Sequence, residues 1–285
     1  MNGILNILKP PHMTSSDVVG KIKKIFNTKK VGHMGTLDPG AAGVLLIGIG
    51  KSTRLFSYLL NSTKIYRAIF RFSIATDTVD SYGKITHQDG IIPSYDDILK
   101  ALEGFRGQIM QRPPKYSAVN VGGRRAYDIA RSGKDFELNK KQVTIKNFEL
   151  KSHDNEYFEF DIECSSGTYI RSLCSDLAAK LDTYAYMSSL IRLACGNFKI
   201  LDSVALDEIQ NTEKFLDAHL IAPKDALCNM EDFEVDSDVF FKLRNGIRVN
   251  LKKANGDYKL FCAEKFYGIV TVENDTVFFK TFLEE

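Results

Sequence analysis

The twelve residues from Gly32 to Gly43, GHMGTLDPGAAG, hold the clearest candidate for chemistry in this chain. Four of them are glycines, which let a backbone approach a ligand closely, and Pro39 fixes the chain directly after the one acid of the segment, Asp38. A single carboxylate on such a rigid, open loop is a candidate nucleophile or general base. Because Asp before Pro is also common in structural turns, the spacing alone leaves that second interpretation open.

Two other segments carry side chains suited to a polyanionic or acidic partner. Tyr66 lies between Lys64 and Arg67, an arrangement that suits base stacking with phosphate neutralisation but equally suits a half-buried strand tyrosine. Arg171 lies in the first turn of a predicted helix, where its charge opposes the helix dipole. That position indicates either a carboxylate partner or an ordinary surface arginine.

The elements that must position these residues are mixed in type. Apolar periodicity predicts helices at residues 17–26, 53–60, 95–103, 124–131 and 168–181, and extended segments at residues 4–8, 44–49, 64–75, 116–121, 142–151 and 156–164. The order lacks the regular strand-helix alternation of a doubly wound sheet. We therefore expect an α+β fold with a mainly antiparallel mixed sheet flanked by helices.

The sequence changes in character near Pro223. Strand-like runs at residues 238–243, 258–263, 266–272 and 276–282 are separated by Asn-Gly or Asn-Asp pairs, which favour hairpin turns. The predicted organisation is a main domain at residues 1–225 and a small all-β module at residues 231–285. The module is too short to bury much apolar surface alone, so we expect it to pack on the main body.

The net charge is only +2, yet its distribution is uneven. Residues 1–72 carry 11 basic and 2 acidic side chains, and residues 105–151 carry 11 and 4, whereas residues 152–285 carry 14 and 24. The two basic stretches could fold into one electropositive face that binds a polyanion, with binding that weakens steeply as salt rises. Solvated helix faces are the alternative.

The five cysteines form no C-x-x-C pair and have no histidine at metal-ligand spacing. They are typical of reduced thiols in a cytoplasmic protein, and no metal site is expected. The N-terminus lacks the pattern of a signal peptide, and no apolar run reaches 18 residues. We therefore expect neither export nor a membrane span.

Eight blocks, in order across residues 3–200, resemble the TruB-type tRNA pseudouridine synthases, which isomerise uridine 55 in the TΨC loop of tRNA. The blocks are Gly3-Ile4 with Lys9-Pro10 and Met13 to Asp17; GHMGTLDPGAAGVL; Lys64 to Arg67; Thr76 to Thr78 with Asp80 and Gly83; Arg112 to Pro114 with Tyr116 to Ala118; Gly123 to Tyr127 with Ala130-Arg131; Gly167 to Leu173; and Leu190 with Arg192-Leu193. The resemblance implies the pseudouridine synthase fold, with a PUA-like RNA-binding module at residues 231–285.

The resemblance also implies roles for individual residues. Asp38 would be the catalytic aspartate, Arg171 its partner, and Tyr66 the side chain that stacks on the target base. The uracil pocket would be lined by Tyr169 and Leu190. His33 would lie among the flipped-out loop nucleotides, and Lys9 would support the Asp38 segment.

Isomerisation of uracil needs an ionised carboxylate in a dry pocket but no redox cofactor or metal. The expected partner is the T stem-loop of tRNA, and we expect a monomer without an obligatory protein partner or guide RNA. Two features depart from the family: Asn120 stands where lysine is common, and residues 231–285 are net acidic. Two other functions stay open, a tRNA-folding chaperone without chemistry and a metal-dependent hydrolase using His33 and Asp38.

Overall fold

The computed structural model describes residues 1–88, 90–209 and 212–283. Ten strands form its main sheet: β1 (Gly3–Lys9), β2 (Val31–Met34), β3 (Ala42–Ile49), β4 (Lys64–Phe72), β7 (Gly107–Gln111), β10 (Lys141–Asp154), β11 (Tyr157–Cys164), β12 (Ala185–Cys195), β13 (Phe198–Lys199) and β14 (Val204–Ala205). They run in the order β14-β1-β3-β12-β4-β11-β10-β7, with β13 beside β12 and β2 beside β3. Most pairs are antiparallel, which confirms the predicted α+β class.

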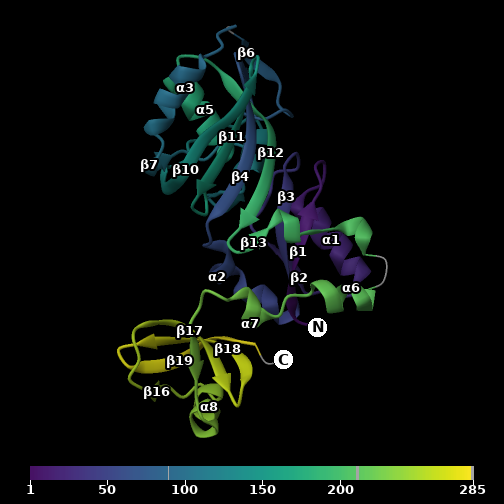
Figure 1. Ribbon diagram of the computed structural model, residues 1–285, viewed down its shortest axis with the longest axis vertical. Coiled ribbons are helices and arrows are strands. Elements are labelled where there is room, and N and C mark those ends of the chain that lie inside the picture. Colours follow the sequence, from purple (N-terminus) through teal and green to yellow (C-terminus); the bar gives the residue numbers. More distant parts are fainter. Residues whose placement is uncertain (89, 210–211, 284–285) are drawn as a thin grey trace.

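Helices flank this sheet, except for the last of them, which packs against the C-terminal sheet (Figure 1). Their bounds are α1 (Ser15–Ile25), α2 (Phe56–Leu60), α3 (Tyr95–Glu103), α4 (Ala126–Arg131), α5 (Ile170–Lys180), α6 (Thr212–His219), α7 (Pro223–Ala226) and α8 (Ser237–Arg244). Thr14 caps α1 through a reciprocal capping box with Asp17, and Val18 and Ile22 bury the apolar face of α1 against β1 and β3. Helices α3 and α5 cover the half of the sheet that contains β4, β10 and β11.

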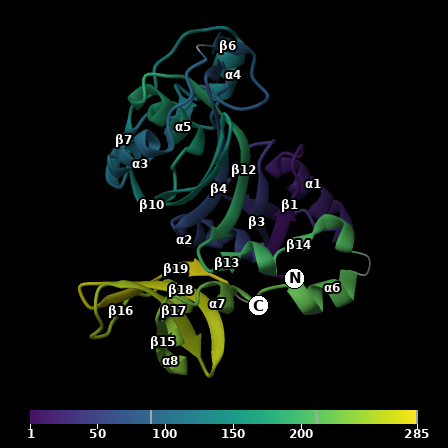
Figure 2. The same cartoon turned by 45° about the horizontal axis from the view of Figure 1, so that its top comes forward.

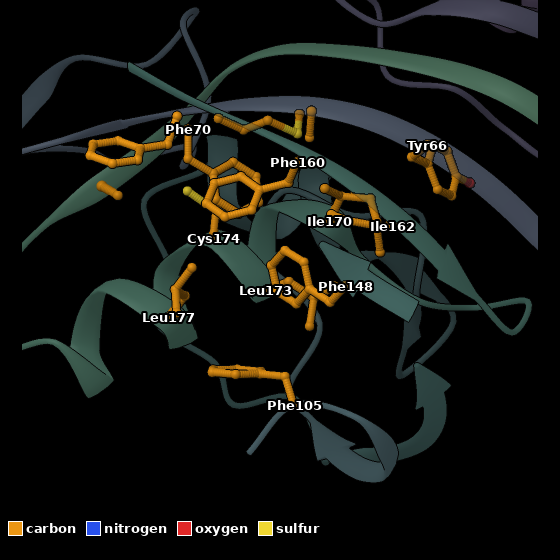
Figure 3. Close-up of a cluster of buried hydrophobic side chains, with 14 of the residues drawn as sticks. Tyr66, Phe70, Phe105, Phe148, Phe160, Ile162, Ile170, Leu173, Cys174 and Leu177 are labelled. Carbon is orange, nitrogen blue, oxygen red and sulfur yellow. The ribbon is translucent and has the colours of Figure 1, made fainter. Parts of the chain in front are cut away.

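A core of phenylalanines lies between α5 and this half of the sheet (Figure 3). On β4 every second side chain points into it, so Tyr66, Ala68, Phe70 and Phe72 are all buried. Tyr66 lies at the edge of the cluster, apart from the phenylalanine rings. Tyr66 therefore lies where the apolar core ends along β4.

The two halves of the sheet meet at a short parallel junction between β3 and β12. Two residue pairs connect these strands, Ala42 with Ile191 and Gly43 with Arg192. By contrast, β1 and β3 pair over their full length, and so do β12 and β4 apart from two bulges. The loop that carries Asp38 leads into β3, so it enters the sheet at this junction.

The C-terminal residues form a separate five-stranded sheet, ordered β15-β17-β18-β19-β16. Its strands are β15 (Asp232–Glu234), β16 (Val249–Asn250), β17 (Gly256–Cys262), β18 (Lys265–Glu273) and β19 (Thr276–Phe282). This sheet lies beside α2 and α7 (Figure 2), and Phe266 and Ile269 of β18 share one apolar cluster with Ile4 and Met34. It is packed on the main body, as expected from its size.

Several predicted elements were wrong. Residues 238–243, predicted as a strand, belong to α8, because Asp236 accepts a hydrogen bond from the Val239 amide and caps a helix. Strand β12 was not predicted. The strand predicted at residues 64–75 breaks at Ser73, which has a φ of 71°, and continues as β5 (Ile74–Thr76), paired with β6 (Ile85–Gln88).

Three further predictions were partly right. Residues 53–60 form the end of a 3-10 helix (Gly50–Leu55) followed by α2. Of residues 116–131, the short strands β8 (Asn120–Val121) and β9 (Arg124–Arg125) precede α4. No helix in the described ranges is both long and apolar enough to cross a bilayer.

Candidate active site

Residues 35–43, here called the Asp38 loop, comprise the connection from β2 to β3 and the first two residues of β3, and they are held by side chains from the N-terminus. The hydroxyl of Ser15, buried in the first turn of α1, accepts a hydrogen bond from the Leu37 amide at 3.0 Å and donates to the Leu37 carbonyl at 3.2 Å. The ammonium of Lys9, which is fully buried, donates to the Pro39 carbonyl at 3.2 Å. The residues on both sides of Asp38 are therefore fixed, so the carboxylate has a defined position.

Asp38 meets Arg171 in a two-point contact. Arg171 Nε lies 2.8 Å from Asp38 Oδ2, and Arg171 Nη2 donates to Asp38 Oδ1 at 3.0 Å. The Arg171 side chain is 6% exposed, whereas that of Asp38 is 34% exposed. The arginine of the pair is thus buried, and the carboxylate is accessible to a substrate.

Three other groups fix the Arg171 guanidinium. It donates to the carbonyl of Thr78 at 3.2 Å and to that of Tyr116 at 2.9 Å. The carboxylate of Asp80 lies 3.8 Å from Nη1. Asp80 is itself held by the Thr78 hydroxyl at 2.5 Å and by the Tyr82 amide at 3.0 Å. These contacts leave the guanidinium little freedom to turn away from Asp38.

The surroundings of Asp38 shift its acidity in opposing directions. Burial raises the pKa of Asp38, because a charged carboxylate loses hydration, and the nearby charge of Asp80 raises it further. The charge and hydrogen bond of Arg171 lower the pKa, as does Lys9. The net result is a carboxyl group with a raised pKa whose ionised form depends on Arg171.

Two apolar walls lie on one face of the sheet near this pair. Tyr66 of β4 and Leu190 of β12 are each 7% exposed and belong to the same buried cluster as Leu37. Burial raises the pKa of the Tyr66 phenol to about 12, so it is neutral at ordinary pH. The structure therefore combines a neutral aromatic ring and an aliphatic side chain with the carboxylate of Asp38.

Tyr169 is the N-cap residue of α5 rather than part of its first turn, which corrects the predicted start of the helix at residue 168. The buried amide of Gln111 accepts from the Tyr169 backbone amide at 2.8 Å and donates to its carbonyl at 3.1 Å. Burial raises the pKa of the Tyr169 phenol. Gln111 thereby fixes the residue two positions before Arg171.

Lys9 contacts the Asp38 loop, and His33 lies two residues before it. His33, on β2, is half-buried; burial and the charge of Arg192 lower its pKa, and among the described residues its Nδ1 atom is buried without a partner. Burial also lowers the pKa of Lys9 to about 8, although Asp38 opposes this. Lys9 donates to the carbonyls of Pro10 and Met13 as well as to that of Pro39.

The cations beside Tyr66 are both engaged by groups of the protein. Arg67 makes a two-point contact with Asp161, at 2.8 Å for both bonds. Lys64 is 5% exposed and donates to the carbonyls of Leu60 and Ser62 at 2.8 and 2.9 Å. Both cations are occupied by protein groups, so the stacking arrangement inferred for this segment rests on Tyr66 alone.

Sequence reasoning did not single out three residues that shape the site: Ser15, Asp80 and Arg192. Each lies inside one of the motif blocks, and membership of a block is the sequence feature that could have identified them. A group of three or more His, Cys, Asp or Glu side chains arranged to hold a metal is absent from the described part of the chain.

Two family models match the chain. That of the TruB family pseudouridylate synthase N-terminal domain matches residues 23–170, and that of the tRNA pseudouridylate synthase B C-terminal domain matches residues 171–230. The tRNA pseudouridine synthase B of Clostridium tetani is 40% identical over 276 residues, which cover 94% of this chain and 95% of the relative. That of Caldanaerobacter subterraneus subsp. tengcongensis is 39% identical over 283 residues, 97% of each chain.

Among solved structures, a chain of a Cbf5-Nop10-Gar1 complex shares the fold with a TM-score of 0.72 and 24% identity, over 95% of this chain and 78% of that one. A chain of an H/ACA RNP bound to a substrate RNA containing 2′-deoxyuridine gives a TM-score of 0.70 and 23% identity, with the same coverage. The fold agrees along nearly the whole chain, and the family models cover residues 23–230. The chain therefore belongs to the TruB family of pseudouridylate synthases.

Proposed function

We propose that this protein converts uridine 55 in the T loop of tRNA into pseudouridine, without a guide RNA, and that Asp38 is its catalytic carboxylate. The relatives that cover nearly the whole chain are named tRNA pseudouridine synthases B, which supports tRNA as the substrate. The T-loop position rests on the resemblance of the motif blocks.

The reaction breaks the bond between N1 of uracil and C1′ of ribose, turns the base, and forms a bond between C5 and C1′. The proton on C5 is lost and N1 gains one, so the overall change is an isomerisation. A carboxylate can serve as the nucleophile or take up the proton. Because the target base is normally stacked, the enzyme must flip it out, at a cost of a few kcal/mol, and recover that cost by stacking and edge contacts.

The Asp38–Arg171 contact is the observation that carries the proposal. A two-point contact with a buried arginine favours the ionised carboxylate in a site where burial alone favours the neutral acid. Tyr66 and Leu190 line the same face of the sheet and would hold an uncharged ring. Tyr169 would line the pocket with them, while Lys9 supports the Asp38 loop and His33 would meet the neighbouring loop nucleotides.

The RNA would also contact surfaces outside the pocket. The basic stretch at residues 105–151 includes the exposed residues Arg124 and Lys134, and we propose that it follows the phosphate backbone. In residues 231–285, proposed as a PUA-like module, Arg248 and Lys252 are exposed on a body that is net acidic overall. Binding should therefore weaken steeply between low and physiological salt, and unchanged affinity would contradict this.

The test uses the purified protein and a T-arm minihelix carrying tritium on C5 of the target uridine. Wild-type protein should release tritium, whereas Asp38→Asn should bind the minihelix with similar affinity and release none. Asp96→Asn, an exposed carboxylate in the first turn of α3, is the matched control and should turn over normally. Near-normal turnover by Asp38→Ala would refute the catalytic role. Tight binding by wild type without tritium release would favour the chaperone function.

A further inference from the structure

Arg192 is a fully buried cation at the junction of the two sheet halves. Its side chain is among the largest that are completely enclosed, and the whole residue is 1% exposed. On β12 its backbone pairs with Gly43 of β3 on one side and with Tyr66 of β4 on the other. Burying a guanidinium is costly unless its donors are used, so its contacts indicate what the charge is kept for.

Two of those contacts lie at opposite ends of the Asp38 loop. Arg192 Nη2 donates to the carbonyl of Gly35, the first residue after β2, at 3.2 Å. Arg192 Nε donates to the carbonyl of Val44, which lies in β3 just after the loop, at 2.6 Å. One guanidinium therefore connects the two ends of the loop whose middle carries Asp38. A lysine, with a single nitrogen, does not reproduce this fork.

Two glycines of the loop, Gly43 and Gly35, lie next to Arg192. Gly43 has a φ of +108°, and a Cβ atom there would lie 2.3 Å from the Arg192 carbonyl oxygen. Gly35 has a φ of +91°, and a Cβ atom there would lie 3.6 Å from Arg192 Nη1. A side chain at position 43 would therefore collide with the Arg192 backbone, whereas at position 35 there is room beside the guanidinium and the positive φ is what favours glycine.

Arg192 also lies beside the proposed stacking residue. Because it is directly opposite Tyr66 in the antiparallel register, the two side chains share one face of the sheet. Leu190, two residues earlier on β12, shares that face as well. The same arginine is therefore in register with the base-binding side chains and hydrogen-bonded to the loop of the carboxylate.

We propose that Arg192 is a positioning residue for the isomerisation, which fixes the Asp38 loop relative to Tyr66 by joining the ends of the loop. This inference deepens the proposed function and rests on it. Arg192 contacts the loop through Gly35 and Val44 and leaves Asp38 to Arg171. It should therefore affect the rate of the chemical step more than the binding of RNA.

Lys64 provides a matched control. It is also a buried cation, 5% exposed, and it too donates to backbone carbonyls. Its acceptors, Leu60 and Ser62, lie at the end of α2 and outside the Asp38 loop. Loss of either cation removes a buried charge, but only loss of Arg192 removes the hydrogen bonds to the carbonyls at the two ends of the loop.

The experiment compares Arg192→Met, Arg192→Lys and Lys64→Met in the full-length protein, at temperatures well below unfolding of each variant. Hydrogen–deuterium exchange is followed in the peptide covering residues 35–43, together with minihelix affinity and single-turnover tritium release. Arg192→Met should exchange faster in this peptide and lose about a hundredfold in single-turnover rate, the scale expected for a misplaced catalytic group, with little change in affinity. Arg192→Lys should recover part of the rate, and Lys64→Met should match wild type in both readouts.

Equal exchange and equal rates in Arg192→Met and wild type would overturn the proposal, as would identical losses in Lys64→Met. If Arg192→Met does not fold, Arg192→Lys decides, since wild-type exchange and rate in that variant would contradict a role that needs both ends of the loop. Wild-type protein gives an independent test, because its 35–43 peptide should exchange more slowly than the exposed loop at residues 122–123. If wild type forms no pseudouridine, the proposed function fails, but the exchange experiment still tests the contact.

Discussion

Arg171 and Asp38 face each other through two parallel contacts, Nε to Oδ2 at 2.8 Å and Nη2 to Oδ1 at 3.0 Å. Arg171→Lys keeps the charge but offers one nitrogen, so the carboxylate loses its fixed orientation. We expect the single-turnover rate to fall by about a hundredfold. Since Arg171 lowers an otherwise raised Asp38 pKa, weakening the contact should move the acidic limb of the pH–rate profile to higher pH.

Arg67→Lys is the control for that change. Arg67 makes the same two-point contact with Asp161, but its side chain is 40% exposed and points to the face of β4 opposite that of Tyr66. Exposed pairs contribute little, so neither the rate nor the pH profile should change. An unshifted acidic limb in Arg171→Lys would show that Asp38 does not titrate in the rate-limiting step.

Removal of the Asp80 charge should lower the plateau rate and also lower the pH at which activity is lost. Its charge raises the pKa of Asp38, and its carboxylate lies 3.8 Å from Arg171 Nη1. Asp80→Asn keeps an oxygen for the Thr78 hydroxyl and the Tyr82 amide but removes the charge. We expect the acidic limb to move to lower pH while the plateau rate falls, because Arg171 loses one of its two acidic partners.

Asp77→Asn tests whether this effect belongs to Asp80 or to the loop as a whole. Asp77 accepts a hydrogen bond from the Lys84 amide at 2.8 Å in the same turn. Asp77→Asn should leave the acidic limb of the pH–rate profile unchanged. A shift of equal size in both variants would assign the effect to loop conformation.

Ser15 connects α1 to the Asp38 loop, and its loss should cost both stability and activity. Ser15→Ala leaves the amide and the carbonyl of Leu37 without their partner in a buried site. An unsatisfied buried group costs about 1–3 kcal/mol, which denaturant unfolding would measure. The single-turnover rate should fall as well, because Leu37 directly precedes Asp38.

Ser203→Ala separates these effects, since Ser203 donates to the Ile200 carbonyl in a turn away from the loop. It should lower stability modestly and leave the rate unchanged. A rate unaffected by Ser15→Ala would mean that the contacts of Lys9, Arg171 and Arg192 suffice to hold the loop.

Helix-dipole and capping rules, which need only neighbouring residues, predicted part of the site and of the fold. Arg171 in the first turn of a helix allowed either a carboxylate partner or an ordinary surface arginine, the resemblance implied Asp38 as that partner, and the structure places Asp38 there. Helix α3 has the predicted bounds, because its cap Ser94 and its apolar spacing agree. Tyr66, by contrast, stood out because cations flank it, and both cations contact protein groups in the structure, so its stacking role is a proposal that rests on the family motif.

Long-range packing determines what the sequence did not reveal. Strand β12 reads AYMSSLIRLAC, and its polar positions interrupt the alternation of a buried strand. Arg192 is one of those positions, and its burial is explained by the carbonyls of Gly35 and Val44, about 150 residues earlier. Residues 238–243 combine aromatic and β-branched side chains, so only the cap at Asp236 shows that they form a helix.

Because of Lys9, the free energy of unfolding should change with pH in the alkaline range. Burial lowers the pKa of Lys9 from 10.5 to about 8, so between these values the unfolded chain binds more protons than the folded one. Unfolding free energy then rises with pH across that window and levels off above pH 10.5. Relative to Lys9→Met, wild type should gain on the order of 1–3 kcal/mol between pH 8 and 10.5, measured by urea unfolding.

Lys23→Met, an exposed lysine of α1, controls for the loss of one positive charge and should keep a constant difference from wild type over the same range. A constant difference for Lys9→Met too would place the Lys9 ammonium in contact with water. A falling difference would mean that the native state favours the charged form, as an ion pair does. The three carbonyl acceptors of Lys9 argue for the rising curve, because dipoles compensate a buried charge less fully than a carboxylate partner would.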